Sequence, residues 1–284
     1  MKQALFWENT KDQSSIKCTL CPNFCLIQQN QTGICRKRKN IQSQLYTTNY
    51  GETITIAIDP MRKKPLYHFH PNENILSIGA NSCNLSCKFC QNYTSSQMQC
   101  KTIRITPTEL INSCTKNNVK HIAFTYTEPF TWFEYIYDTA ILLKENNISV
   151  VLITNGYVNP QPLNQILPYI DAMNIDLKAF SNEFYQTQCN ATLEPVLNTI
   201  RTAATKTHIE ITLLLIETLN DDTELLDQMF TFIRDINPEI PLHISKYFPR
   251  YKAQIPPTKN EAVYKAVEQA QKYLKYEYAG NIHN

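Results

Sequence analysis

The sequence lacks three things: a long apolar segment, an excess of charge and an ordinary content of glycine. No run is long enough to span a membrane, and the first residues lead into polar sequence without the apolar core of a secretion signal. The 27 basic residues nearly balance the 25 acidic ones, which argues against a membrane or nucleic-acid partner and, with the missing signal, predicts a cytoplasmic protein. With only five glycines, we expect each to lie where backbone geometry requires it.

The strongest feature that is present is a set of ten cysteines, seven of which fall in two tight groups. In a chain without a secretion signal, such clustering favours metal ligation or redox chemistry over a disulfide framework.

The pattern after residue 74 predicts an α/β fold. Six short apolar runs, at 75–79, 121–125, 148–154, 172–177, 208–215 and 241–245, alternate with helix-length segments at 108–117, 131–145, 162–169, 194–205 and 221–235, and a closing helix is expected at 258–274. Six βα repeats are too few for an eight-stranded barrel, so we predict a partial (β/α)6 TIM-like barrel over residues 75–284.

Residues 1–74 are expected to form a Cys-rich N-terminal appendage with a β-hairpin. Ile54, Ile56 and Ile58 alternate with other residues just after a turn around Gly51, which is typical of a half-buried strand.

The second cysteine group follows the first predicted strand. Cys83, Cys87 and Cys90 have the spacing C-x3-C-x2-C, and three thiolates on one loop can bind three irons of a [4Fe–4S] cubane while the fourth iron stays open. The alternative is a structural zinc or fully ligated cluster, but such sites normally close with four protein ligands, and only Cys100 lies nearby.

Polar residues stand at or near the ends of the other predicted strands, where βα barrels carry their chemistry. Glu128 could hold an ammonium group, although a Glu-Pro pair also begins helices. Asn155 precedes Gly156 at a strand exit that a plain turn would explain equally well. Asp176 and Lys178 share a strand face and could bind an amino acid's charged ends, or simply pair with each other.

Two further strands carry polar residues at alternate positions. Glu210 lies on the fifth run and His243 on the sixth, and polar residues inside buried strands suggest a barrel lumen that binds a ligand. A histidine in such a place is more often a satisfied core residue.

The first cysteine group consists of Cys18, Cys21, Cys25 and Cys35. Four thiolates within eighteen positions would repel one another without a metal, so an auxiliary Fe–S cluster or zinc is expected; free thiols or disulfides are the alternative.

At Cys83, Cys87, Phe89 and Cys90 the chain resembles the radical S-adenosylmethionine (SAM) superfamily, whose signature is C-x3-C-x-aromatic-C. The resemblance implies a [4Fe–4S] cluster whose open iron binds SAM and cleaves it to a 5′-deoxyadenosyl radical. It also implies SAM contacts, which we expect from Phe89, Glu128, Asn155, Asp176, Lys178, Glu210 and His243. No separate catalytic residue is assigned.

Further runs narrow the resemblance. Cys18-Thr19-Leu20-Cys21-Pro22, Lys63-Lys64-Pro65-Leu66-Tyr67-His68-Phe69 and Phe248-Pro249-Arg250-Tyr251-Lys252 are similar to the radical SAM protein of the AmmeMemoRadiSam system, a relative of pyruvate formate-lyase-activating enzymes. This implies an activase-like oxidoreductase that removes hydrogen from a protein substrate and takes electrons from a flavodoxin- or ferredoxin-type donor. Radical modification of a small molecule, peptide or RNA, and a non-catalytic iron–sulfur or zinc protein, are the alternatives.

Overall fold

A computed structural model describes residues 1–11 and 15–282, and its centre is one sheet of eight strands in the order β16-β15-β14-β13-β12-β11-β9-β8. The strands are β8 (Ile56–Pro60), β9 (Asn74–Ile78), β11 (His121–Phe124), β12 (Ser149–Thr154), β13 (Ala172–Asp176), β14 (His208–Leu215), β15 (Leu242–Lys246) and β16 (Glu277–Gly280). All neighbours pair in parallel except β8 and β9. The six predicted strand runs correspond to β9 and β11 to β15, which confirms the predicted α/β partial barrel.

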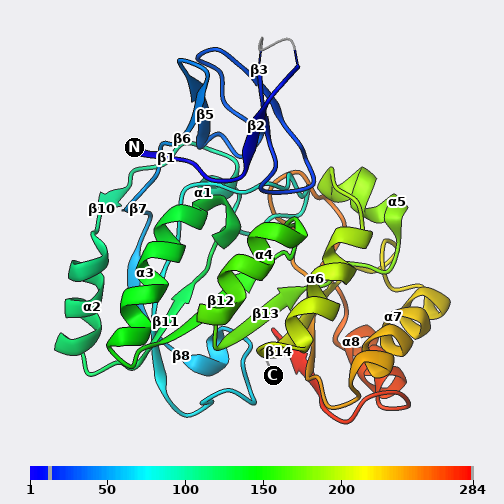
Figure 1. The fold of residues 1–284 in the computed structure, drawn as a ribbon. Coiled ribbons are helices and arrows are strands. Elements are labelled where there is room, and N and C mark those ends of the chain that lie inside the picture. The colour runs from blue at the N-terminus through cyan, green and yellow to red at the C-terminus, as the bar shows by residue number, and fades with distance from the viewer. Residues whose placement is uncertain (12–14, 283–284) are drawn as a thin grey trace.

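Helices line the outer face of this sheet (Figure 1). The longer ones are α2 (Pro107–Lys116), α3 (Phe133–Glu145), α4 (Pro160–Ile166), α6 (Glu194–Ala204), α7 (Thr223–Ile236) and α8 (Asn260–Ala270). The predicted helix at 162–169 is divided into α4 and a 3-10 turn, Leu167–Tyr169, because Pro168 has no N–H for a regular helical hydrogen bond. Within the part of the chain that the structure describes, no helix has the length and apolarity needed to cross a membrane.

The two outermost strands differ from the prediction. β16 has the sequence Glu-Tyr-Ala-Gly, which shows no apolar run, and it forms by pairing with β15. β8 contains Ile56 and Ile58 of the predicted hairpin, but it pairs with β9 and so belongs to the barrel sheet. The barrel sheet therefore begins before residue 74, the predicted boundary of the appendage.

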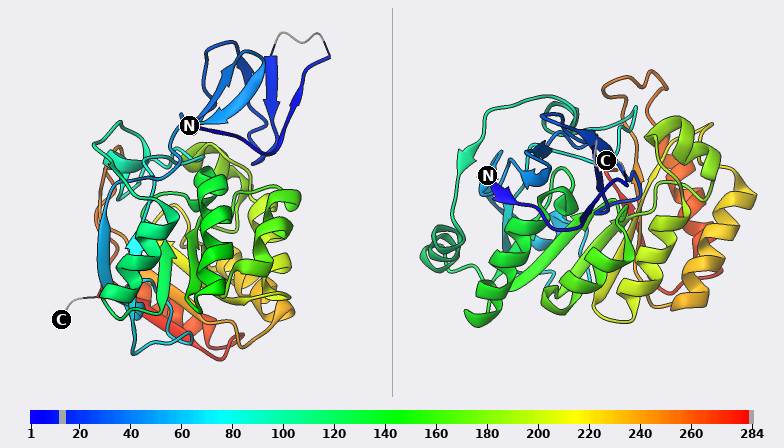
Figure 2. Two further views of the ribbon diagram at one scale, coloured as in Figure 1. Left: turned by 60° about the vertical axis from the view of Figure 1, so that its left-hand side comes forward. Right: turned by 45° about the horizontal axis from the view of Figure 1, so that its top comes forward.

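The N-terminal strands form two small antiparallel sheets at one end of the barrel (Figures 1 and 2). One has the order β1-β6-β5 and the other β2-β3-β4. Their bounds are β1 (Lys2–Gln3), β2 (Trp7–Asn9), β3 (Ser15–Cys18), β4 (Leu26–Gln28), β5 (Arg38–Ile41) and β6 (Gln44–Thr47); β7 (Glu52–Thr53) pairs separately with β10 (Ile103–Arg104). Asn159 donates its backbone N–H to Leu20 O at 3.1 Å and its side-chain amide to Thr19 O at 2.7 Å. Since Asn159 follows β12, these sheets contact the carboxyl ends of the barrel strands.

A buried ion pair joins the appendage to the barrel. Arg38 on β5 lies 2.5 Å from Glu134 on α3, and both side chains are 1% exposed. Glu134 also accepts a hydrogen bond from Leu5 N, while Arg38 donates to Leu5 O. Because a single buried charge is very unfavourable, neither partner can leave without the other.

Gly79 allows the barrel strands to approach closely where β9 ends. A Cβ atom at this position would lie 2.3 Å from Thr125 O, which no side chain tolerates. The glycine thus meets the expectation of a geometric requirement, and it sits immediately before the cysteine loop at 83–90.

The amino-terminal end of the barrel is closed by residues 61–73, the connection between β8 and β9. Pro65 O accepts a hydrogen bond from Asn174 on β13 at 2.8 Å. Met61 and Leu66 are fully buried against Ala123 and Val151 of the sheet. The segment 61–73, called the plug below, fills this end, so any ligand of the barrel must enter near the carboxyl ends of the strands.

The buried pair makes a prediction about stability. Glu134→Ala should lower the free energy of unfolding by ~3–5 kcal/mol, because Arg38 would remain as an uncompensated buried charge. The matched change Glu194→Ala, in the exposed pair with Arg201, should cost less than about 1 kcal/mol. Urea unfolding of the iron-free proteins, followed by circular dichroism, measures both; equal effects would contradict the assignment.

Candidate functional site

The three cysteines of the C-x3-C-x2-C motif lie on one loop that follows β9. The loop is anchored to a π-helical turn, Tyr185–Cys189, by two backbone hydrogen bonds: Ser86 N to Cys189 O at 3.1 Å and Lys88 N to Gln188 O at 2.9 Å. Cys87 is buried, and Cys83 and Cys90 are half-buried. The loop therefore holds its sulfur atoms in place on the barrel's carboxyl side.

The residues fit an iron–sulfur cluster. Among residues 1–11 and 15–282, no three cysteine sulfurs lie within 4.8 Å of one another, which suits ligands that each bind a different iron. Several polar groups approach the sulfurs: Leu85 N lies 3.4 Å and the Asn155 amide 3.7 Å from Cys83 Sγ, and the Ser96 hydroxyl lies 3.2 Å from Cys90 Sγ. Such contacts tune the charge and potential of cluster ligands.

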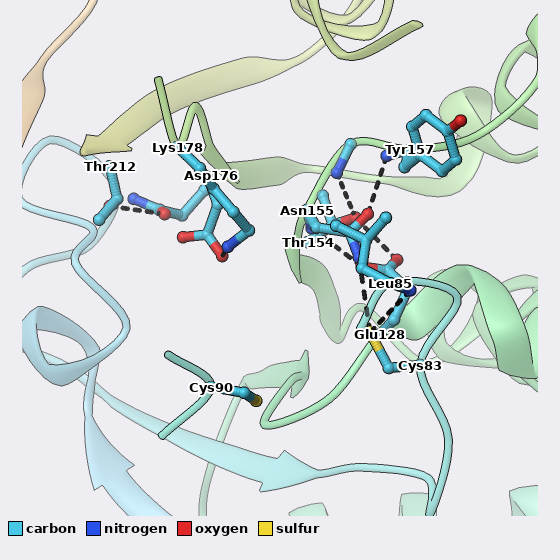
Figure 3. Close-up of polar contacts among 12 residues, drawn as sticks. Cys83, Leu85, Cys90, Glu128, Thr154, Asn155, Tyr157, Asp176, Lys178 and Thr212 are labelled. Carbon is cyan, nitrogen blue, oxygen red and sulfur yellow. Dashed lines mark hydrogen bonds and ion pairs between the residues drawn. The ribbon is translucent and has the colours of Figure 1, made fainter. Parts of the chain in front are cut away.

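Glu128 is fully buried in the turn that follows β11, and its carboxylate joins this turn to β12. Its oxygens accept hydrogen bonds from Phe130 N at 3.0 Å, Thr154 Oγ1 at 2.8 Å and Asn155 N at 2.9 Å. Burial raises the pKa of Glu128 to about 7, despite these three donors. Figure 3 shows Thr154, Asn155 and Cys83 gathered around it. In this structure the Glu128 carboxylate positions Asn155, and its predicted contact with SAM stays a prediction.

Asn155 connects this carboxylate to the cysteine loop. Its side-chain amide donates to Asn84 Oδ1 at 3.0 Å, and its own Oδ1 accepts from Tyr157 N at 2.8 Å. Asn84 in turn donates to Tyr157 O at 2.7 Å. The sequence identified Asn155 but not Asn84, because an asparagine between cysteines carries no signal of its own.

Asp176 and Lys178 form an ion pair at the end of β13, with Nζ 2.9 Å from Oδ2. In the view of Figure 3 they lie on the opposite side from the Glu128 group, with Cys90 below and between. Asp176 keeps 36% and Lys178 15% of its side-chain surface exposed, so the pair can exchange partners with a zwitterionic ligand. Lys178 also lowers the pKa of Cys87, after the larger effect of a hydrogen bond from Cys189.

Glu210 and His243 lie in a different layer of the barrel. Glu210 pairs in register with Asn174, two residues before Asp176 on β13, and it faces the plug. Its carboxylate accepts from Tyr67 N at 2.9 Å and His68 N at 2.7 Å, and it contacts the ring nitrogens of His208 at 3.0 Å and His243 at 2.6 Å.

In this structure these two residues fix the plug to β14 and β15, and their predicted contact with SAM stays a prediction. Glu210 is 0% exposed, and with four protein partners it has no oxygen left for a ligand. His243 is 3% exposed, and it stacks on Tyr278. Alternation along a strand shows which face a residue occupies but not how deep it lies.

Phe89, the aromatic residue of the motif, is buried against Phe184, with ring centroids 5.8 Å apart. In this structure it packs the cysteine loop against the turn at 182–189. A residue that the sequence did not single out lies in the same turn: Cys189 is buried, its backbone oxygen accepts a hydrogen bond from Ser86 N, and its thiol lies beside that of Cys87. Their separation in the sequence hides this contact.

The fold and site together define a partial α/β barrel with three cysteines on one loop at its carboxyl end. A family model described as "Radical SAM superfamily" matches residues 77–230, more than half of the chain. The chain belongs to the radical SAM superfamily. Membership implies a [4Fe–4S] cluster and SAM as cofactors and supports the prediction of an enzyme.

Known proteins resemble this chain in sequence and in fold. The protein is 40% identical, over 99% of its length and 86% of the relative, to an uncharacterized protein from Methanocaldococcus jannaschii. The fold resembles a domain of pyruvate-formate lyase-activating enzyme from Bacteroides vulgatus (TM-score 0.50, 20% identity, 56% of this chain and 98% of that one). It also resembles a radical SAM methyltransferase from Sphaerobacter thermophilus (TM-score 0.59, 13% identity, 74% and 67%). At such identities the likeness shows the fold alone.

The raised pKa of Glu128 predicts a pH dependence. The folded carboxyl binds its proton more tightly than the unfolded one, so its stabilisation is complete below pH 4.5 and is lost as the pH rises to about 7. Relative to Glu128→Gln, the iron-free wild type should lose ~3 kcal/mol of unfolding free energy over this range. Denaturant titrations at half-unit pH steps measure the difference, with the exposed Glu145→Gln as control. A difference that does not change with pH would refute the assignment.

Proposed function

We propose that the protein reductively cleaves SAM at a [4Fe–4S] cluster held by Cys83, Cys87 and Cys90, and uses the resulting 5′-deoxyadenosyl radical to remove a hydrogen atom from a protein residue. The observation that carries the proposal is the position of the three-cysteine loop, opposite an ion pair that can receive an amino acid's charged groups. When bound, the cluster supplies one electron to the sulfonium of SAM.

The residues of this chain bind and position. Asp176 would accept the ammonium of SAM, and Lys178 would donate to its carboxylate, in place of their hydrogen bond to each other. Glu128 and Asn155 hold the cysteine loop in a fixed position at the carboxyl ends of the strands. The plug, fixed by Glu210, closes the far end of the barrel and limits water at the site.

Two features support a protein substrate. The resemblance to the AmmeMemoRadiSam radical SAM protein, a relative of pyruvate formate-lyase-activating enzymes, favours an activase-like reaction. The barrel also keeps an open edge at β8, where Ile56 and Ile58 are 38% and 44% exposed on the side away from the buried Asp59. Apolar side chains exposed beside a site are typical of surfaces that bind a macromolecule. We propose a flavodoxin- or ferredoxin-type protein as the electron donor.

Anaerobic reconstitution tests the reaction. After addition of iron, sulfide and a reductant, the wild type should convert SAM to 5′-deoxyadenosine and methionine, and the variant with Cys83, Cys87 and Cys90 all changed to Ala should lose more than about 100-fold of this rate. Cys114→Ala, a buried cysteine on α2 outside both groups, is the control and should retain the rate.

The protein-substrate part has its own readout. Deuterium from a labelled candidate protein should appear in 5′-deoxyadenosine. Formation of 5′-deoxyadenosine by the triple variant would overturn the cluster assignment. Transfer from a small molecule instead of any protein would overturn the activase-like reaction and leave SAM cleavage standing.

Replacing a carboxylate by an amide should have different effects at Asp176, near the cysteine loop, and at Glu210, beside the plug. Asp176→Asn should weaken SAM binding about 10- to 100-fold, since it removes a charge-assisted hydrogen bond worth ~1.5–3 kcal/mol. Glu210→Gln should leave SAM affinity within about threefold but lower the unfolding free energy by ~1–3 kcal/mol, because its donors lose an acceptor. Calorimetric SAM titration and urea unfolding measure the two properties; a larger loss of affinity in Glu210→Gln would contradict the layer assignment.

A further inference from the structure

The first cysteine group surrounds a hollow between the appendage and the barrel. It is lined by Cys18, Leu20, Cys21, Asn23, Cys25, Ile27, Gly33, Cys35, Arg38, Asn84 and Thr131. Cys18, Cys21 and Cys35 are buried, Cys25 is half-buried, and all four are free thiols. Four ligands of one type therefore face one hollow.

The spacing of these sulfurs separates the two metals that the sequence left open. A tetrahedral zinc holds its sulfurs about 3.8 Å apart, because each Zn–S bond is about 2.3 Å. No three of the cysteine sulfurs in the described parts of the chain come within 4.8 Å of one another. The ligands of a cubane stand farther apart because each binds a different iron.

A second observation concerns Arg38. Its guanidinium is 1% exposed and borders the hollow, and its Nε has no hydrogen-bond partner among the described residues. A buried N–H without an acceptor costs about 1–3 kcal/mol, so its place beside the cysteines points to a missing acceptor. The sulfides and thiolates of a cluster are such acceptors, and the positive charge of Arg38 opposes their negative charge.

The hollow shares a wall with the SAM site. Asn84, which borders the hollow, directly follows Cys83 in the chain, and its backbone oxygen accepts a hydrogen bond from Asn23 at 2.8 Å. Asn84 also binds Asn155, whose amide lies 3.7 Å from Cys83 Sγ. A cluster in the hollow would therefore border Asn84, the residue that directly follows Cys83, a ligand of the SAM cluster.

We propose that Cys18, Cys21, Cys25 and Cys35 bind a second [4Fe–4S] cluster that passes electrons to the SAM cluster. A low-potential one-electron donor of the flavodoxin or ferredoxin class reduces the second cluster. That cluster is then oxidised as it reduces the SAM cluster, and no bond to carbon or hydrogen changes in this transfer. The relay rests on the proposed SAM cleavage, whereas the ligand set does not.

The ligand set is tested in the chain with Cys83, Cys87 and Cys90 changed to Ala, which leaves the first group intact. After anaerobic reconstitution with iron, sulfide and equimolar zinc, this variant should retain about four iron and four sulfide per chain, with the Mössbauer signature of a [4Fe–4S] cluster, against about eight of each in the wild type. Retention of about one zinc per chain without iron would overturn the proposal, as would a chain that binds neither metal.

The relay is tested by changing the electron donor. Cys25→Ser alters the most exposed ligand, and circular dichroism should confirm that this variant folds. Its 5′-deoxyadenosine formation should fall more than about tenfold with reduced flavodoxin but stay within about twofold of wild type with dithionite, a small reductant that reaches the SAM cluster directly. Cys100→Ser, outside both groups, is the control.

Equal rates of Cys25→Ser and wild type with flavodoxin would overturn the relay. If the wild type itself forms no 5′-deoxyadenosine with either reductant, the proposed function fails, while the iron content of the triple variant still decides the ligand set.

Discussion

The carboxylate of Glu128 is the contact on which both cysteine sites depend. It is buried, it joins the ends of β11 and β12, and it fixes the backbone of Asn155. Asn155 then holds Asn84, the residue that lies between Cys83 and the hollow of the first cysteine group. A polar chain of this kind is rigid only if each member is satisfied, and three donors to Glu128 supply that condition.

Much of the fold follows from the sequence, because buried parallel strands are continuous apolar runs. Each of the six predicted runs became a strand, and the cysteine loop, Glu128, Asn155, Asp176 and Lys178 follow or end strands as expected. β16 could not be predicted, since Glu277–Gly280 has no apolar pattern and its strand conformation comes from the neighbouring β15. Strand formation at a sheet edge is a tertiary effect that a local pattern does not record.

The sequence also does not show how deep in the barrel each polar residue of a strand lies. Glu210 and Thr212 point the same way from β14, but Thr212 is level with Asp176 while Glu210 is level with Asn174 and faces the plug. Only the register with β13 separates a residue near the cysteine loop from one that holds the opposite end closed. Cys189 was missed for a related reason, because its contact with Cys87 spans more than a hundred residues.

The layer of Glu210 and the layer of Asp176 and Lys178 serve different chemical purposes. The radical proposed to form at the cysteine loop would react with whatever C–H bond it meets, so the barrel must be closed on the side where no substrate enters. Glu210 achieves this closure with hydrogen bonds to two consecutive backbone N–H groups of the plug, a contact that depends little on plug side chains. The upper layer is different, since Asp176 and Lys178 have mainly each other as partners and remain partly exposed. The hydrogen bonds of Glu210 are all made within the protein, whereas Asp176 and Lys178 can exchange each other for a ligand. Ligand binding is therefore confined to the end of the barrel where the cysteine loop and the appendage meet.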